Sequence, residues 1–161
     1  PLTAAALARV LRPLLQDVNV VSAPALLKER GVTLTESTRD TSPTYDSLIR
    51  VKVKTGGGWR TLAGAVIAGQ PRIVEVKAMA LEAPFHANTL YINNSDQPGF
   101  IGALGTLLGD AGINIATFHL GREGAGAEAI ALVGVDQAPP PAVMDKLKTL
   151  PQVRYAKLLR F

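Results

Sequence analysis

The first thirty residues repeat apolar positions with a helical period. Residues 3–16 place apolar side chains at the i, i+3, i+4, i+7 and i+8 spacing of one helix face, namely Leu7, Val10, Leu11, Leu14 and Leu15. The pattern predicts an amphipathic helix, which Pro13 kinks or shortens because proline lacks the backbone N–H. A second helix is expected over residues 25–30, capped by Ser22 and ended by Gly31.

After residue 32 the apolar period changes to two, which is typical of strands. We expect four strands, over residues 33–39, 47–54, 59–68 and 72–80. The glycines at 56–58 predict a hairpin turn rather than a phosphate-binding loop, because no helix follows them. Residues 1–87 are therefore expected to form a small α+β domain with an antiparallel sheet, ending in a linker at 83–87. No strand opens this domain, so we expect it to be truncated at its N-terminus.

The second half of the chain alternates strand and helix patterns in the order βαββαβ. Strands are expected over residues 89–95, 113–120, 127–135 and 152–160, and helices over 99–111 and after the prolines at 139–141. The strand at 127–135 is apolar on both faces, as a central strand is. A shift of the apolar phase between Ile115 and Phe118 predicts a bulge. The order predicts a ferredoxin-like domain at residues 88–161, so the expected class is α+β throughout.

The net charge of +4 comes entirely from the first half of the chain. Residues 1–88 hold eleven Lys/Arg and seven Asp/Glu, whereas residues 89–161 hold six of each. This mild excess suits a phosphate-bearing small molecule, an acidic partner or a solvated surface, and does not favour nucleic acid. RNA recognition is also not expected, because the strand AEAIALVGV has no aromatic or basic residue.

The sequence lacks the usual catalytic, redox and metal-binding patterns. It has no cysteine, and its two histidines, His86 and His119, show no metal-ligand spacing. No Ser/His/Asp arrangement can be assembled, and neither GxGxxG nor GxxxxGK[ST] occurs. No apolar run approaches the ~18 residues of a membrane span. We expect a soluble, cytoplasmic chain that binds a ligand rather than one that catalyses a reaction.

The stretch from Asn93 to Gly99 connects an expected strand to a glycine-bearing helix. Backbone N–H groups at the helix start can hold a carboxylate, and Asp96 offers oxygens to an ammonium group. Asn114, just after the helix, is placed to close the same site from a symmetry-related chain. These groups match a free amino acid. The alternative left open is that Asp96 caps the helix and Asn114 serves the turn after Gly112.

Two features predict a homo-oligomer. Gly102, Gly105 and Gly109 share one helix face, where they either admit close approach of a partner or pack tightly on the chain's own sheet. The apolar strand at 127–135 needs cover on both faces, and the helices of one protomer cover only one of them.

Two parts of the sequence resemble a known family. NNSDQPGFIGALGTLLGDAGINIA resembles the opening of an ACT domain, with its Asp-x-Pro-Gly turn and Gly-Ile-Asn-Ile strand start. NVVSAPALLKERGV and GAVIAGQPRIVEV resemble the intervening, allosteric substrate-binding domain of long-form D-3-phosphoglycerate dehydrogenases. The resemblance covers nearly the whole chain, and it implies the C-terminal regulatory part of such an enzyme. The NAD-binding glycines and the catalytic histidine–glutamate pair of that family belong to an upstream region.

In that family L-serine is a feedback inhibitor bound between the ACT domains of two subunits. The resemblance implies Asn94, Asp96 and Asn114 as serine contacts. Asn94 stands where relatives have tyrosine or histidine, and Gln97 replaces a common arginine. The implied parent enzyme oxidises 3-phosphoglycerate with NAD in the first step of L-serine biosynthesis.

The intervening domain in some family members binds an anion, either phosphate or a phosphorylated substrate. Arg72 matches a basic position of that site, whereas Pro84 stands where such members have a second basic residue. Two other functions stay open for the chain as a whole. The first is a ligand-free ACT dimerisation module, and the second is the regulatory part of an iron–sulfur L-serine dehydratase.

Overall fold

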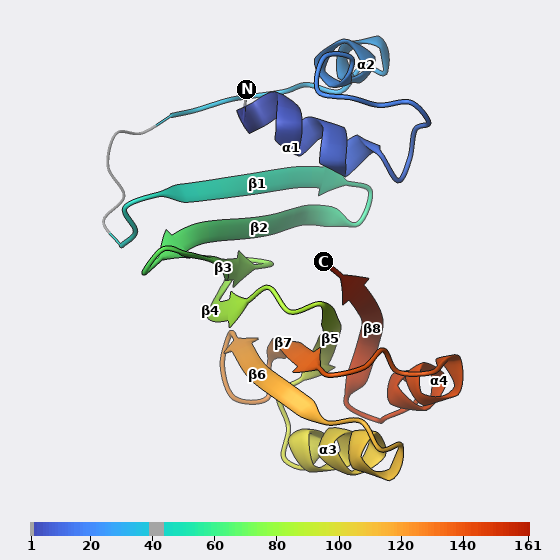
Figure 1. The fold of residues 1–161 in the computed structure, drawn as a ribbon. Coiled ribbons are helices and arrows are strands. Elements are labelled where there is room, and N and C mark those ends of the chain that lie inside the picture. The colour runs from blue at the N-terminus through green and yellow to red at the C-terminus, as the bar shows by residue number, and fades with distance from the viewer. Residues whose placement is uncertain (1, 39–43) are drawn as a thin grey trace. The chain divides into compact units, whose positions relative to one another are not determined.

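The computed structural model describes residues 2–38 and 44–161, and the chain divides into two compact units, Pro1–Thr41 and Ser42–Phe161 (Figure 1). In chain order the elements are α1 (Leu2–Leu11), α2 (Ala23–Glu29), β1 (Leu48–Thr55), β2 (Gly58–Ile67), β3 (Gln70–Val76), β4 (Met79–Pro84), β5 (Asn88–Ser95), α3 (Phe100–Asp110), β6 (Ile115–Arg122), β7 (Glu128–Val135), α4 (Pro141–Lys148) and β8 (Val153–Arg160). The α+β class predicted from the sequence is confirmed.

The first unit is a pair of short helices joined by an apolar cluster. Its buried members are Ala8, Leu11, Val18, Ala23 and Leu27. The helix predicted over residues 3–16 ends early, because Pro13 cannot continue the backbone hydrogen bonding beyond Leu11. Ser22 does not cap α2 with its side chain. Its hydroxyl instead accepts a hydrogen bond from the Asn19 N–H at 3.1 Å, within a local turn.

The strand predicted over residues 33–39 is wrong for its described part. Residues 33–38 adopt no regular structure, and residue 39 lies outside the described residues. Leu34 is exposed there. A lone extended segment leaves its backbone groups unpaired, so alternation of side chains without a neighbouring strand does not make a sheet.

The first sheet is an antiparallel meander with the strand order β1-β2-β3-β4. As predicted, the glycine turn joins β1 to β2 as a hairpin, and Gly58 takes a φ of +98° that favours glycine. The single strand predicted over 72–80 is two strands, β3 and β4. Lys77 and Ala78 form the turn between them with positive φ angles, a conformation that neither residue type signals. β4 also takes in Pro84, so part of the predicted linker is strand.

The second sheet has the order β6-β7-β5-β8, with every neighbouring pair antiparallel. With α3 and α4 it forms the predicted ferredoxin-like βαββαβ arrangement. The register of β6 shifts between Ile115 and Thr117, which confirms the bulge. The predicted boundary between residues 87 and 88 falls between β4 and β5 and stays a prediction, since both sheets belong to one compact unit.

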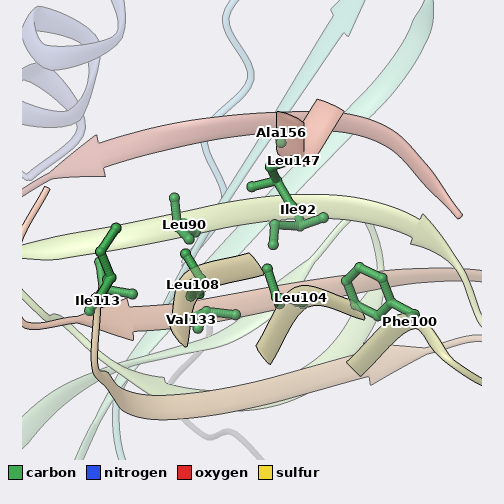
Figure 2. Packing of buried hydrophobic residues seen from close by; sticks show 11 residues of the cluster. Leu90, Ile92, Phe100, Leu104, Leu108, Ile113, Val133, Leu147 and Ala156 are labelled. Atoms are coloured by element: carbon green, nitrogen blue, oxygen red, sulfur yellow. The ribbon is translucent and has the colours of Figure 1, made fainter. Parts of the chain in front are cut away.

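The main core lies on the face of the second sheet that the helices cover, called here the helix face. Figure 2 shows Leu104 and Leu108 of α3 beside Leu90 and Ile92 of β5. Each of these four side chains is fully buried, as is Leu147 of α4. Even-numbered residues of β5 point to this face because side chains alternate along a strand.

The opposite face, called here the sheet–sheet face, is covered by the first sheet. Ile130 and Leu132 of β7 cluster with side chains of β3 and β4, namely Ile73, Val76, Met79 and Ala83. The two-sided apolar character of β7 is therefore satisfied within one chain. It gives no support to self-association, which the sequence analysis had inferred from it.

Candidate functional site

The turn between β5 and α3 is hydrogen-bonded to the turn between β6 and β7. The Asp96 N–H donates to the Ala127 carbonyl at 2.8 Å, and the Gly126 N–H donates to the Asp96 carbonyl at 3.0 Å. Arg122 Nη1 donates to Asp96 Oδ2 at 3.0 Å, which makes an ion pair. The Asp96 side chain is 17% exposed and that of Arg122 is 58% exposed. Asp96 is thus largely shielded, and its charged partner faces solvent.

The interpretation of Asp96 as a helix cap is wrong. Gly99 occupies the N-cap position of α3 with a φ of +91°, and no side chain makes a capping hydrogen bond there. The first backbone N–H groups of α3 have no partner within the helix by geometry. They therefore stay available to a ligand beside the Asp96–Arg122 pair.

Asn94 lies on the helix face at the end of β5 and is almost fully buried, with 1% exposure. Its Nδ2 donates to the Ser95 carbonyl at 3.0 Å, whereas its Oδ1 has no hydrogen-bond partner among the described residues. A buried acceptor without a donor costs about 1–3 kcal/mol. A ligand hydroxyl or ammonium group at this oxygen removes that cost.

Gln152 is a residue of this region that the sequence analysis missed. Its carbonyl accepts the Ser95 N–H at 2.8 Å, and its Nε2 lies 3.8 Å from the position of a Cβ built on Gly99. Its Oε1 is a second buried acceptor that no described donor reaches. Arg122 was missed as well. Both residues come close to Asp96 through strand pairing, which no local sequence signal reveals.

Asn114 lies at the opposite end of α3 from Asp96. The helix has 11 residues and so separates its ends by roughly 16 Å. Asn114 Nδ2 donates to Asp136 Oδ2 at 2.8 Å, so the side chain joins β6 to the segment after β7. The carbonyl of Gly112 is held instead by Gln137 at 3.1 Å. Within one chain, Asn94 and Asp96 lie two residues apart around the end of β5, whereas Asn114 lies beyond the far end of α3.

The glycine face of α3 is open in this chain. A Cβ built on Gly102, Gly105 or Gly109 meets nothing within 4 Å among the described residues. Tight packing of these glycines on the chain's own sheet is therefore wrong, since the buried residues of α3 are Phe100, Leu104 and Leu108.

Arg72 lies in the interior strand β3 of the first sheet. Its Cα is paired with Ala65 of β2 and with Pro84 of β4, so the two positions implied for an anion site are cross-strand neighbours. The Arg72 Nε is buried and has no hydrogen-bond partner in the described part of the chain. A guanidinium with an unused buried N–H can receive an anion, and Pro84 contributes no donor to it.

The described residues form no candidate metal cluster, and their glycine-rich turn does not fit NAD. No group of three or more His, Cys, Asp or Glu gathers in residues 2–38 and 44–161. The glycine-rich turn before β2 joins two strands, so it does not fit the pyrophosphate of NAD, which needs a following helix. None of the described helices combines the length and apolar content that crossing a bilayer requires.

Comparison with known proteins finds a matching family model for each of two parts of the chain. Residues 1–77 match the family model of the D-3-phosphoglycerate dehydrogenase intervening domain, and residues 88–152 match the ACT domain. The D-3-phosphoglycerate dehydrogenase of Bacillus subtilis is 33% identical over 161 residues, covering 98% of this chain and 30% of that protein. Those of Methanocaldococcus jannaschii and Archaeoglobus fulgidus are 32% and 33% identical, over 88% and 92% of this chain.

The chain spans 27% to 30% of the length of these three relatives. The resemblance inferred from the sequence is confirmed, with both domain types in the expected order. The turn that holds Asn94 and Asp96 lies inside the ACT match, and Arg72 lies inside the match to the intervening domain.

Proposed function

We propose that this chain, which matches a D-3-phosphoglycerate dehydrogenase intervening domain followed by an ACT domain, is a regulatory and oligomerisation region that senses L-serine. The parent protein is a cytoplasmic NAD-dependent D-3-phosphoglycerate dehydrogenase. It oxidises 3-phosphoglycerate in the first step of L-serine biosynthesis. The chemistry and the NAD site belong to other parts of that protein, since the residues described here do not fit NAD.

The unpartnered Oδ1 of Asn94 is the observation that carries the serine proposal. Asp96 and Arg122 present one charge of each sign beside it, which suits the ammonium and carboxylate groups of an amino acid. The uncapped start of α3 adds backbone donors for the carboxylate. Asn114 completes the site from a second copy, because the length of α3 keeps it from reaching the same ligand in its own chain.

Serine then acts by shifting a conformational equilibrium. A ligand held by two ACT domains favours the arrangement of subunits in which both sets of contacts are made. The coupling to the catalytic part equals the difference in serine affinity between the two arrangements. The proposal includes a second effector, phosphate or a phosphorylated substrate, bound at Arg72. The unpartnered Nε of Arg72 supports it.

Calorimetric titration of the chain with L-serine tests the proposal. Asp96→Ala is expected to weaken binding at least tenfold, since it removes a charge-assisted contact of about 1.5–3 kcal/mol. Asp145→Ala is the matched control, because this aspartate of α4 is 74% exposed and forms an ion pair with Lys148 rather than contributing to the proposed site. L-Alanine, which lacks the hydroxyl group, is expected to bind more weakly than L-serine. The absence of any heat with millimolar L-serine contradicts the proposal.

A ligand-free dimerisation module is the second candidate. It is favoured by the Asp96–Arg122 pair, which satisfies the carboxylate without a ligand, and by the open glycine face of α3. A stable dimer in sedimentation, with a melting temperature that serine leaves unchanged, supports this candidate instead. A regulatory part of an L-serine dehydratase is less well supported, because the three relatives described above are dehydrogenases.

A further inference from the structure

A pocket of about 400 Å³ opens on the sheet–sheet face, on the opposite side of β5 from Asn94. Its lining residues come from both sheets of the second unit, and they are Arg60, Lys77, Tyr91, Asn93 and Tyr155. Arg60 belongs to β2 and Lys77 to the turn after β3, while the other three project from β5 and β8. The proposed serine site uses none of these side chains.

The pocket holds two cations, of which one lacks an ion pair. Lys77 forms an ion pair with Glu128 of β7, and both side chains are less than a quarter exposed. Arg60 donates to the carbonyls of Gly57 and Trp59, each at 3.2 Å, and pairs with no carboxylate among the described residues. A guanidinium has five N–H donors in a planar fork, so Arg60 keeps donors for an anion.

Asn93 supplies an acceptor that nothing in the described chain satisfies. Its Nδ2 donates to Glu128 Oε1, which fixes the orientation of the amide because a carboxylate only accepts. The Oδ1 is buried and unpartnered. A ligand that occupies the pocket needs a hydroxyl or another donor at this oxygen.

Two tyrosines form an aromatic side of the pocket. The rings of Tyr91 and Tyr155 lie 6.0 Å apart in an edge-to-face arrangement. Burial raises the pKa of the Tyr91 phenol above its ordinary value, and the Glu128 carboxylate raises it further, although Arg60 opposes them. The Tyr91 phenol therefore stays protonated near neutral pH and can donate to an anion.

We propose that this pocket binds a small anion that also carries a hydroxyl group, with the anionic group on Arg60 and the hydroxyl on Asn93. The carboxylate of Glu128 is already engaged by Lys77 and by the Asn93 amide. Carboxylate and phosphate both meet the requirement of Arg60, and the experiment separates them.

The test is a titration of the 161-residue chain with four probes, followed by calorimetry and by NMR of side-chain amides. Glycerate and glycerol 3-phosphate carry an anion and a hydroxyl group, methyl phosphate lacks the hydroxyl group, and glycerol lacks the anion. We expect saturable binding of glycerate or glycerol 3-phosphate, which identifies carboxylate or phosphate as the preferred group. Methyl phosphate and glycerol are expected to bind at least about tenfold more weakly, a difference of one decade in Kd.

Arg60→Gln is expected to weaken binding of the preferred probe by about tenfold or more. Lys52→Gln removes the same charge from the neighbouring strand β1, where Lys52 lies over the Trp59 ring. Arg60 is paired with Val53, so Lys52 projects from the opposite face of the hairpin and its loss leaves binding unchanged. Asp96→Ala also leaves this binding unchanged, which separates the pocket from the serine site.

The Asn93 side-chain amide gives a readout that needs no variant. Its resonances are expected to move on saturation with the preferred probe, whereas those of Asn114 stay in place. The proposal is overturned if no probe binds saturably below about 10 mM, which corresponds to a very weak interaction. Equal loss of binding in Arg60→Gln and Lys52→Gln overturns it too, because nonspecific charge attraction then explains the binding.

Discussion

The two faces of the second sheet are buried by different means. The helix face is filled by aliphatic side chains from β5, β7, α3 and α4, with Asn94 as a polar exception at its edge. The sheet–sheet face combines an apolar cluster around Ile130 and Leu132 with the charged group of Lys77 and Glu128. One face is an aliphatic core with a polar residue at its edge, and the other is partly apolar and partly an open polar pocket.

This difference follows from what covers each face. Helices present broad apolar stripes that interdigitate with a sheet, so aliphatic side chains fill most of the space between them. Two sheets in contact through β3, β4 and their turn meet over a smaller apolar cluster. Polar side chains therefore occupy the remainder of the sheet–sheet face, where ligands can reach them. The fully buried side chains are concentrated on the helix face, and the two proposed ligand sites lie where polar side chains interrupt the apolar packing.

The largest expected effect is on the helix face. Leu104→Ala is expected to lower the free energy of unfolding by about 2–5 kcal/mol, because the side chain is fully buried and leaves a cavity. Ile101→Ala on the same helix is the control, since Ile101 is 56% exposed, and its loss is expected to change stability by less than about 0.5 kcal/mol. Urea unfolding followed by circular dichroism measures both. Equal losses mean that α3 does not pack through Leu104.

A smaller effect is expected where the two sheets approach each other. A Cβ built on Gly121 of β6 lies 3.0 Å from the Ala80 carbonyl oxygen of β4. Gly121→Ala is therefore expected to cost about 1–3 kcal/mol, since a backbone atom has to shift.

Gly105→Ala is the matched control for this change. Its added methyl group meets nothing within 4 Å, and alanine is the better helix former, so stability is expected to rise by up to about 1 kcal/mol. Thermal melting of both variants measures these two changes in stability. A neutral Gly121→Ala shows that the sheets are further apart than the structure has them.

The smallest effect is the pH dependence of the sheet–sheet face. The Lys77 hydrogen bond, with help from Asn93, holds the pKa of Glu128 below its ordinary value of 4.5. A carboxyl group with a lowered folded-state pKa contributes stability above its unfolded pKa, and this contribution disappears as the pH falls through the folded value.

Glu128→Gln is expected to remove this contribution to the free energy of unfolding, which is about 1 kcal/mol or less for a partly exposed ion pair. Melting temperatures measured from neutral pH down to acid should therefore fall less steeply in the variant than in the wild type below pH 4.5. Identical slopes mean that the Lys77–Glu128 pair contributes nothing to stability. Lys148→Gln, which breaks the exposed pair with Asp145, is the control and leaves the acid slope unchanged.

Particular elements show which parts of the fold could be predicted from the sequence. The helical period of α3 and the two-sided apolar run of β7 predicted their elements within two residues, because each pattern repeats over several turns or pleats. The turn at Lys77 was missed because it has neither glycine, proline nor asparagine. The strand at 33–38 was wrong because alternation alone does not supply a hydrogen-bonding partner.

The residues near the proposed serine site divide in the same way. Asn94 and Asp96 could be proposed from the sequence because they are close to a recognisable strand–helix turn. Arg122 and Gln152 were missed because β5 has other strands on both sides, and only their pairing brings these residues to the turn. The pocket of Arg60, Asn93 and Tyr155 gave no sequence signal, since its members come from separate strands.

The sequence by itself determined the elements, the βαββαβ order and the turn at Asp96, because each depends on residues that are neighbours along the chain. Only the tertiary structure decided what covers the second face of β7, which cation pairs with Asp96 and where a polar pocket lies. Those outcomes depend on the register and contact of strands far apart in sequence, and a periodic pattern specifies a face without specifying the surface that meets it.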